Sequence, residues 1–323
     1  MKLSEIIEDL DAVLFSKTEK DITEFVDSGS YALNKIISGK YKGGYPIGAI
    51  TEIWGESAAG KTVFLTHAFI GAQAKDYYAI MLDNEHSYNP VFAKSLGVDN
   101  DRLIYAEPVA IEDCFDFIEK TILKIRENDR KTPIVIGLDS VGTTPCRKEL
   151  EGEIGDNDVI IGALRAKTMG NCLRRINPLL KKHKVCLIII NQLRSKIGVV
   201  YGDPRTKAGG GKSLEYYCSV SLEVKAPKSG IMHDDVGKSS GITGSMFASK
   251  NKVAIPFQEA EFELLFDKGL SKDYGLCGVL IKDRLVISPK KGYYAFAGTN
   301  HEGSRESTIN SQALTKIESN ELL

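Results

Sequence analysis

Short apolar runs recur along the chain and alternate with stretches whose apolar residues have helical spacing. We predict strands at residues 49–54, 78–82, 103–106, 134–138, 185–190 and 220–224. Helices are predicted between most of them, for example at 62–75 and 111–127. Because strands that are apolar throughout are buried on both faces, this alternation predicts an α/β fold with a mostly parallel sheet flanked by helices.

The pattern changes at the N-terminus. Residues 3–14 carry an apolar stripe at helical spacing, which predicts a short amphipathic helix, and a polar stretch follows at 16–30. Such a helix cannot bury its stripe on itself, so it must pack on its own domain or on another chain. The stripe consists of Leu3, Ile6, Ile7, Leu10 and Leu14.

The pattern changes again after about residue 270, where two short apolar runs precede a polar tract at 299–312 and a short final helix. Residues 227–244, rich in Gly, Ser and Lys, are expected to form a mobile loop. We therefore predict an N-terminal helix and linker at 1–30, a core at 31–269 and a small C-terminal domain at 270–323.

Composition excludes several classes of protein. The chain has 323 residues, which is enough for about two domains. Its longest apolar run, 185–190, is far shorter than the ~18 residues of a membrane-spanning helix. The acidic N-terminal segment does not resemble a signal peptide. The six cysteines form no CxxC pair and no zinc spacing with the five histidines, so reduced thiols and a cytoplasmic location are expected.

The net charge of −1 hides an uneven distribution of charge. Residues 162–212 hold twelve Lys and Arg and a single acid, Asp203, for a net charge of +11. The rest of the chain is therefore at −12. A basic block in an acidic protein is typical of a polyanion partner, although a solvated helix face has the same composition.

Residues 55–62, GESAAGKT, fit the pattern GxxxxGK[ST] between a predicted strand and a predicted helix. In a P-loop of this kind, backbone N–H groups and the helix N-terminus hold phosphate oxygens. The lysine reaches the β- and γ-phosphates, and the hydroxyl ligates Mg²⁺. We predict ATP and Mg²⁺ as ligands. The nucleotide-binding residues are Gly55, Glu56, Ser57, Ala58, Ala59, Gly60, Lys61, Thr62 and Val63.

Polar side chains follow three further predicted strands. Asp139 ends one strand and is expected to hold Mg²⁺ together with Thr62. Glu85 follows another strand and is our candidate to activate water, with Asp83 as the competing candidate. Asn191 and Gln192 end the third. In open α/β sheets, ligands bind at the carboxyl ends of the parallel strands, where all of these residues are expected.

Residues 28–269 resemble the RecA recombinases of bacteria and their phage counterparts. The shared motifs occur in the family order and include GESAAGKT, LDNEHSYNP (82–90), GLDS (137–140), ELEGEIGD (149–156), NQLRSKIG (191–198) and KNKVAIPFQEAEF (250–262). Residues 165–169 and the C-terminal segment look closer to the phage proteins.

The resemblance implies an ATP-dependent strand-exchange protein with a RecA-like ATPase core, which forms a helical filament on single-stranded DNA and pairs it with double-stranded DNA. DNA-binding loops would fall at 153–161 and 193–211. Gln192 would sense the γ-phosphate and couple it to the second loop. The implied DNA-binding residues are Arg165, Arg174, Arg194, Lys196, Ile197, Gly209, Gly210, Gly211 and an apolar residue of 159–161, for which we choose Ile160.

The resemblance also implies contacts between subunits. Lys250 and Lys252 would reach the neighbour's ATP, Tyr216 would lie at the same boundary, and the helix at 3–14 would dock on the next subunit. Phe92 would stack on adenine. Asn89 stands where the bacterial pattern has an aspartate that contacts the base, and its amide oxygen would accept from the adenine amino group. A single-strand-binding or loader protein would be a further partner, in a bacterial cell or a phage-infected host.

Two other functional hypotheses compete with a recombinase. A ring helicase with the same core would usually carry a further domain and an arginine finger. A non-catalytic, nucleotide-regulated binding protein would be expected to lack Lys61, Glu85 or Asp139, and all three are present.

Overall fold

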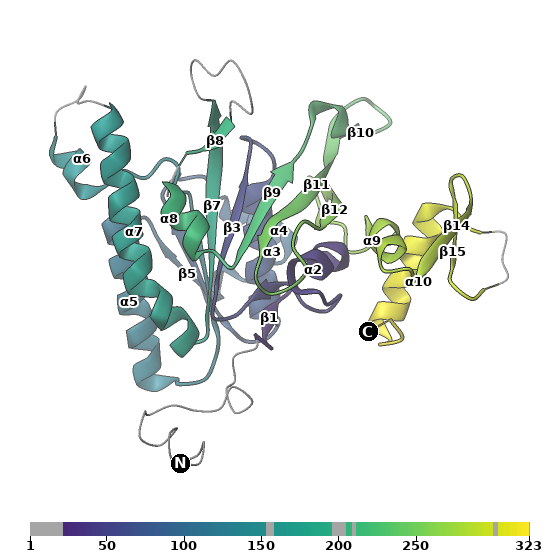
Figure 1. The fold of residues 1–323 in the computed structure, drawn as a ribbon, viewed down its shortest axis with the longest axis horizontal. Helices are drawn as coiled ribbons and strands as arrows, with labels where there is room; N and C mark the ends of the chain where they lie inside the picture. Colours follow the sequence, from purple (N-terminus) through teal and green to yellow (C-terminus); the bar gives the residue numbers. More distant parts are fainter. Residues whose placement is uncertain (1–21, 153–157, 196–204, 209–210, 300–302, 323) are drawn as a thin grey trace, which may run out of the picture.

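The computed structural model describes residues 22–152, 158–195, 205–208, 211–299 and 303–322. Within them, a sheet of eleven strands is covered by helices on both faces (Figure 1). Its parallel part runs in the order β9-β3-β7-β6-β4-β5, which confirms the predicted α/β fold. All six predicted strands are present: β3 (Ile50–Gly55), β4 (Tyr78–Asp83), β5 (Leu103–Ala106), β6 (Ile134–Asp139), β7 (Val185–Ser195) and β9 (Val220–Lys225).

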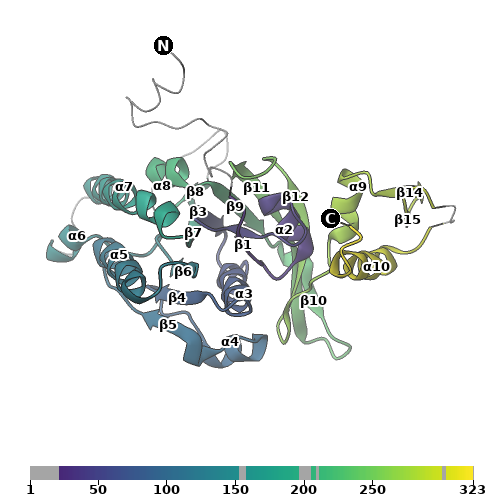
Figure 2. The same ribbon diagram turned by 90° about the horizontal axis from the view of Figure 1, so that it is seen from below.

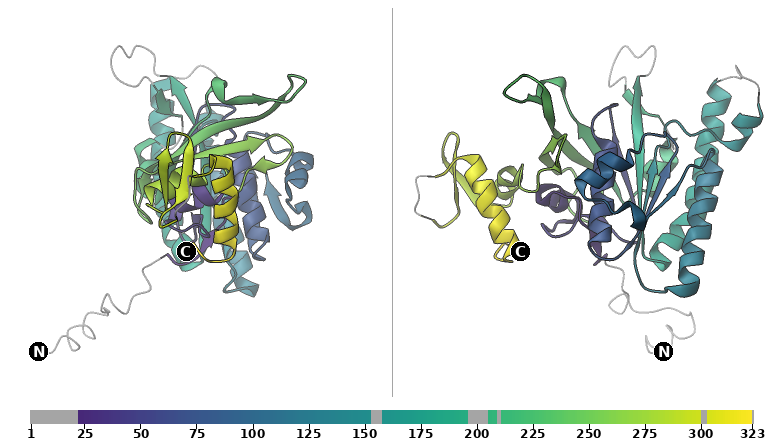
Figure 3. Two further views of the ribbon diagram at one scale, coloured as in Figure 1. Left: turned by 90° about the vertical axis from the view of Figure 1, so that its right-hand side faces the viewer. Right: turned by 180° about the vertical axis from the view of Figure 1, so that it is seen from behind.

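The sheet continues beyond β9 with antiparallel strands. These are β11 (Ser239–Asn251), β12 (Glu259–Leu265) and β13 (Gly269–Leu270). The short strand β10 (Ile231–His233) pairs with β11, and β8 (Arg205–Lys207) pairs with β7. The β10–β11 hairpin projects from the sheet (Figure 3). The prediction of a mobile loop at 227–244 is therefore wrong, because this segment forms a 3₁₀ turn, η3 (Lys228–Gly230), and a β-hairpin.

The sheet separates two groups of helices (Figure 2), and each of its faces has its own hydrophobic core. Alternate strand residues enter opposite cores. In β6, Ile134, Ile136 and Leu138 enter one core and Val135 enters the other. The first face carries α5 (Ile111–Asn128), α7 (Asp158–Lys182), α8 (Gly211–Tyr217) and, beside them, α6 (Arg147–Glu151). The second carries α2 (Tyr31–Ser38), α3 (Lys61–Gln73), α4 (Pro90–Leu96) and the turn η2 (Asn100–Arg102).

Helix α3 lies close to the sheet because β6 has a glycine beneath it. A Cβ on Gly137 would lie 2.4 Å from Cδ1 of Leu65. This close packing holds the N-terminus of α3, which follows β3 directly, at the edge where β6 and β4 end.

The two ends of the described chain are built into this core. Strand β1 (Phe25–Val26) pairs with β2 (Tyr45–Pro46). At the other end, α9 (Leu276–Lys282) lies beside α2 and β12, and β14 (Val286–Lys290), β15 (Tyr293–Phe296) and α10 (Glu306–Glu318) pack on α9 and on one another. Asp283 accepts a hydrogen bond from the hydroxyl of Tyr41 (2.7 Å) and pairs with Lys35 (2.9 Å).

The final helix begins earlier than predicted. It starts at Glu306, inside the tract that we expected to be polar and irregular, because Ile309, Ala313 and Ile317 recur every four residues and are all buried. The predicted helix at 3–14, with Leu3, Ile6, Ile7 and Leu10, lies outside the described residues. Within the described residues, none of the helices has the length and apolar character needed to cross a membrane.

Candidate active site and DNA-binding face

The P-loop connects β3 to α3 as the sequence predicts. A Cβ on Gly55 would lie 2.4 Å from the carbonyl oxygen of Val224, so only glycine fits there. Gly60 has φ +82° and serves as the N-cap of α3. These two glycines let the backbone turn tightly, which aims the first N–H groups of α3 at the space above the sheet.

Lys61 is buried and donates hydrogen bonds to the carbonyl oxygens of Gly55 (3.3 Å) and Glu56 (2.5 Å). Burial lowers its pKa, while the charges of Asp139 and Glu85 act in the opposite direction. The ammonium thus lies over the loop, near two carboxylates. A phosphate would give it an anionic acceptor in place of the neutral carbonyl groups.

Thr62 donates a hydrogen bond to Oδ2 of Asp139 at 2.6 Å. Asp139 is 1% exposed, and burial raises its pKa to about 6 despite this hydrogen bond. A hydroxyl and a carboxylate are hard oxygen donors of the kind that Mg²⁺ prefers. These two residues therefore suit a magnesium ion that accompanies a triphosphate.

The structure separates the two candidates for water activation. Asp83 is fully buried and accepts hydrogen bonds from the backbone of Ser87 (3.2 Å) and Tyr88 (2.9 Å) and from the hydroxyl of Tyr105 (3.1 Å). Glu85 is exposed at the same edge. Asp83 shapes the turn after β4, which leaves Glu85 as the carboxylate that water can reach.

Glu85 and Gln192 meet although they are 107 residues apart. The Gln192 side chain donates from Nε2 to Oε1 and Oε2 of Glu85, both at 2.8 Å. The turn that carries Glu85 is itself held by β6, since the carbonyl oxygen of Asp139 accepts hydrogen bonds from the N–H groups of Asn84 (2.7 Å) and Glu85 (3.2 Å). Register brings the strand ends level, because Gly55 pairs with Gln192 and Asp83 with Asp139.

Asn89 has a structural role at the start of α4. Its Oδ1 accepts hydrogen bonds from the backbone N–H groups of Val91 and Phe92, both at 3.0 Å, and so caps the helix. The cap uses the oxygen that we expected to accept from an adenine amino group. Phe92 is half-buried in the first turn of the same helix. The adenine contacts of both residues stay predictions.

Lys250 and Lys252 lie in the antiparallel part of the sheet, two strands from β3. Lys250 pairs in register with Ser221, which pairs with Glu52, three residues before Gly55. Its ammonium donates to the carbonyl oxygens of Glu215 and, at 3.2 Å, Tyr216. Lys252, one residue beyond the end of β11, lies 6.0 Å from the centre of the Tyr216 ring. Tyr216 is 74% exposed. The contact of these lysines with a neighbour's ATP stays a prediction.

The predicted second DNA loop is carried by a β-hairpin of β7 and β8. Leu193 pairs with Lys207, and the N–H of Ala208 donates to the carbonyl oxygen of Gln192 (2.7 Å). Arg194 is exposed on this hairpin and donates to the carbonyl oxygen of Gly142 (3.2 Å). Gly211, with φ +51°, begins α8. Lys196, Ile197, Gly209 and Gly210 lie outside the described residues.

The remaining predicted DNA-binding residues lie on α7. Arg165 forms a bidentate pair with Glu149, with Nε 2.6 Å from Oε2. Arg174 is exposed nine residues further along the same helix, which is about 13 Å at 1.5 Å per residue. The DNA contact of Arg174 stays a prediction. Ile160 lies in the first turn of α7, and its side chain is outside the described part.

Comparisons with known proteins agree with this geometry. Residues 10–271 match the model of the RecA N-terminal domain. The chain belongs to the RecA family. Protein RecA of Mycoplasmopsis pulmonis is 35% identical over 92% of this chain and 83% of its own length. Protein RecA of Nocardioides sp. is 38% identical over 81% of this chain and 71% of its own length.

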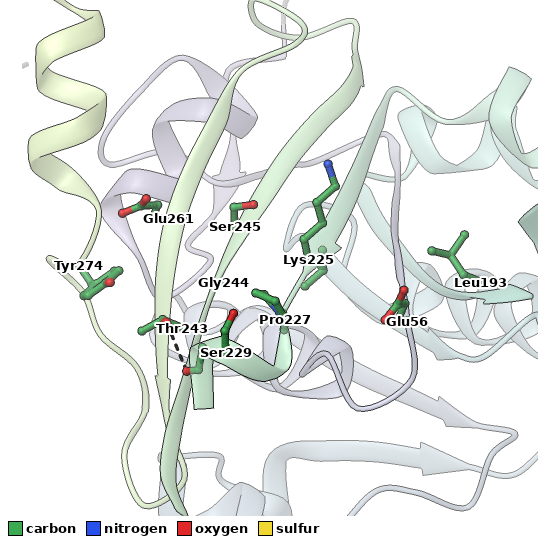
Figure 4. Close-up of a pocket in the computed structure, with 13 residues that line it drawn as sticks. Glu56, Leu193, Lys225, Pro227, Ser229, Thr243, Gly244, Ser245, Glu261 and Tyr274 are labelled. Atoms are coloured by element: carbon green, nitrogen blue, oxygen red, sulfur yellow. Dashed lines mark hydrogen bonds between the residues drawn. The ribbon is translucent and has the colours of Figure 1, made fainter. Parts of the chain in front are cut away.

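Beside the P-loop of this RecA family member lies a cavity of about 570 Å³ (Figure 4). Glu56 and Leu193 line one side, and Glu261 and Tyr274 line the other. Among its lining residues, Lys225 is the one cation against two acids. This cavity therefore lacks the positive charge of a triphosphate site and is distinct from the cradle formed by the P-loop N–H groups.

One polar cluster near the site was not predicted from the sequence. Glu52 lies in β3, is fully buried, and pairs with Lys207 of β8. The available signal was an acid inside an apolar strand, Ile50–Gly55, because a carboxylate is rarely buried there without a partner. The partner could not be read from the pattern, since it is 155 residues away.

Proposed function

We propose that this RecA family protein is a DNA-dependent ATPase that forms a helical filament on single-stranded DNA. In this proposal the filament pairs the bound strand with homologous double-stranded DNA and exchanges strands. A single-strand-binding or loader protein is a further expected partner. The bacterial relatives named Protein RecA, 35% and 38% identical to this chain, support the proposal.

The contact between Gln192 and Glu85 is the observation that carries the proposal. Gln192 begins the hairpin assigned to DNA, and Glu85 is the carboxylate assigned to ATP hydrolysis. A γ-phosphate close to Glu85 offers the Gln192 amide a competing acceptor. A change of partner at Gln192 would move the first residue of the hairpin, so nucleotide state and DNA affinity would be coupled.

Each residue of the site has a separate role in ATP hydrolysis. Lys61 and the N–H groups of the P-loop bind the β- and γ-phosphates, and Glu85 orients the attacking water. Thr62 and Asp139 would hold Mg²⁺, which would neutralise phosphate charge when bound. Lys250 and Lys252 would supply positive charge from the next subunit.

The finer assignment to a phage-type recombinase, acting in the cytoplasm of an infected cell, is also part of the proposal. It rests on the likeness of residues 165–169 and of the C-terminal segment to the phage proteins.

Electron microscopy with single-stranded DNA and a slowly hydrolysed ATP analogue tests the assembly, and ATP turnover with and without DNA tests the coupling. Long helical filaments and turnover stimulated by single-stranded DNA support the proposal. Closed rings would favour a ring helicase. Equal ATP turnover with and without DNA would contradict the coupling.

A further inference from the structure

A buried ion pair joins the base of the β7–β8 hairpin to the strand that leads into the P-loop. Glu52, three residues before Gly55, is 0% exposed, and Lys207, the last residue of β8, donates to its Oε2. The Lys207 side chain is 22% exposed. Both ends of this contact are therefore placed next to functional elements, one before the P-loop and one at the hairpin base.

The pair is fully embedded in a network of hydrogen bonds. Glu52 accepts at Oε1 from Nδ2 of Asn191 (3.0 Å) and at Oε2 from the hydroxyl of Ser221 (2.8 Å). Trp54 donates from Nε1 to the same hydroxyl (2.9 Å), and Lys207 also reaches it (3.2 Å). The Lys207 ammonium lies 4.6 Å from the centre of the Trp54 ring. Strands β3, β7, β8 and β9 thus converge on one carboxylate.

Stability alone does not account for such a pair. Burying two charges costs about as much as their attraction returns, and apolar side chains of similar volume often stabilise a core equally well. Unlike apolar packing, the directional contacts of Lys207 fix one position of β8. They hold Lys207 against Glu52 of β3 while Lys207 pairs with Leu193 of β7.

The geometry gives the hairpin two attachments to the nucleotide site. One is the Gln192–Glu85 contact, which a γ-phosphate can replace. The other is the Lys207–Glu52 pair, in which the Glu52 carboxylate is fully buried. If the second attachment were absent, movement of Gln192 would shift both strands of the hairpin together. The position of β7 relative to β8 would then not change.

We propose that Lys207, through Glu52, is a positioning residue that holds β8 fixed, so that a change at Gln192 alters the DNA-binding loop between the two strands. Its ammonium serves Glu52 and not a DNA phosphate. This inference rests on the proposed function, because it specifies how nucleotide state reaches the loop.

Four proteins test the inference: the wild type, Lys207→Arg, Lys207→Met, and the double variant Glu52→Gln/Lys207→Met. The double variant removes both buried charges, and the amide that replaces the Glu52 carboxylate keeps partners in Asn191 and Ser221. It therefore avoids the uncompensated charge that Lys207→Met leaves. The measurement is single-strand affinity with a slowly hydrolysed ATP analogue and with ADP, over a range of salt, with thermal unfolding as the folding control.

We expect the wild type and Lys207→Arg to bind DNA at least about tenfold more tightly with the ATP analogue than with ADP. In the double variant this ratio should fall below about threefold, while its melting temperature and the salt slope of binding match the wild type. A double variant with the wild-type ratio would overturn the inference. A flatter salt slope, with DNA affinity reduced equally with the ATP analogue and with ADP, would also overturn it. That result would show that Lys207 contacts a DNA phosphate. A wild-type protein without any nucleotide effect would instead contradict the proposed function.

Discussion

At the scale of single residues, burial and hydrogen bonding separate side chains that the sequence leaves equivalent. Asp83 ends β4 and Glu85 follows it, and the sequence makes either a candidate to activate water. Asp83 is fully buried with three hydrogen-bond donors, whereas Glu85 is exposed and contacts Gln192. Asn89 shows the opposite case, in which a residue predicted to contact a ligand caps a helix.

The variants Glu85→Gln and Asp83→Asn should therefore fail in different ways. Glu85→Gln should lower ATP turnover by about 10²-fold or more, because the water loses its base, while nucleotide affinity and melting temperature are kept. Asp83→Asn should lower the melting temperature, since it replaces a buried carboxylate that accepts from three donors. Turnover and nucleotide binding by purified variants, with unfolding curves, make the comparison. Normal turnover in Glu85→Gln would refute the assignment of the base.

His67 should make stability depend on pH. It is buried in α3, its Nε2 accepts from the N–H of Leu270 (3.0 Å), and burial lowers its pKa to about 4. The unfolded chain binds a proton on this ring below pH ~6.5 and the folded chain does not, so stability is lost as the pH falls from ~6.5 to ~4. The loss approaches about 3 kcal/mol.

Urea unfolding of the wild type and His67→Gln at pH 7 and pH 4.5 measures this contribution. The free-energy advantage of the wild type should shrink at the lower pH. His233→Gln, which changes an exposed histidine of β10, is the matched control and should follow the wild type. Parallel pH dependence in wild type and His67→Gln would contradict the account.

At the scale of elements, the strands of the parallel sheet could be predicted because each is buried on both faces and therefore reads as an apolar run. The β10–β11 hairpin could not. Its glycines argue for a loop, yet they are placed where neighbouring backbones come closest. A Cβ on Gly244 would lie 2.3 Å from the carbonyl oxygen of Lys225, and one on Gly241 would lie 2.7 Å from that of Leu264. Pairing with β9 and β12 overrides the local propensity.

The same distinction applies to the candidate site. The P-loop, Asp139 and Glu85 follow from local motifs at strand ends. The Glu52–Lys207 pair depends on which strands become neighbours in the sheet, which local patterns do not encode.

Binding of single-stranded DNA should depend in part on the positive charge of the β7–β8 hairpin. Arg194→Ala removes one cation from it, so the slope of log K against log salt should become shallower by up to about 0.7. Lys181→Ala, the same loss of charge at the exposed far end of α7, is the control and should leave the slope unchanged. Fluorescence anisotropy over a salt series measures both. Equal slopes for wild type and Arg194→Ala would place Arg194 outside the DNA interface.

At the scale of the whole molecule, we propose that a neighbouring subunit completes the active site. Lys250 and Lys252 lie at and just beyond the end of β11, two strands from β3, and we propose that they act on a neighbour's nucleotide. The exposed Tyr216 lies beside them and belongs to the same surface. Turnover is therefore expected to be a property of the interface between subunits.

Mixing two inactive proteins tests this expectation. Lys61→Ala has no functional P-loop, and Lys250→Ala/Lys252→Ala has no lysines to offer its neighbour. Each alone should be nearly inactive with DNA. In an equal mixture, about a quarter of the interfaces combine an intact P-loop with intact lysines, so about a quarter of wild-type turnover should return. No recovery in mixtures that form filaments would show that the lysines do not act between subunits.

We expect that ATP lets this protein pair a bound single strand with homologous duplex DNA. The most direct test is joint-molecule formation between a labelled oligonucleotide and supercoiled duplex, with homologous and heterologous duplexes in parallel and Lys61→Ala as the control. We predict joint molecules that require ATP, wild-type protein and homology. If wild-type protein coats the single strand and hydrolyses ATP but yields no joint molecules with homologous duplex, the account is contradicted.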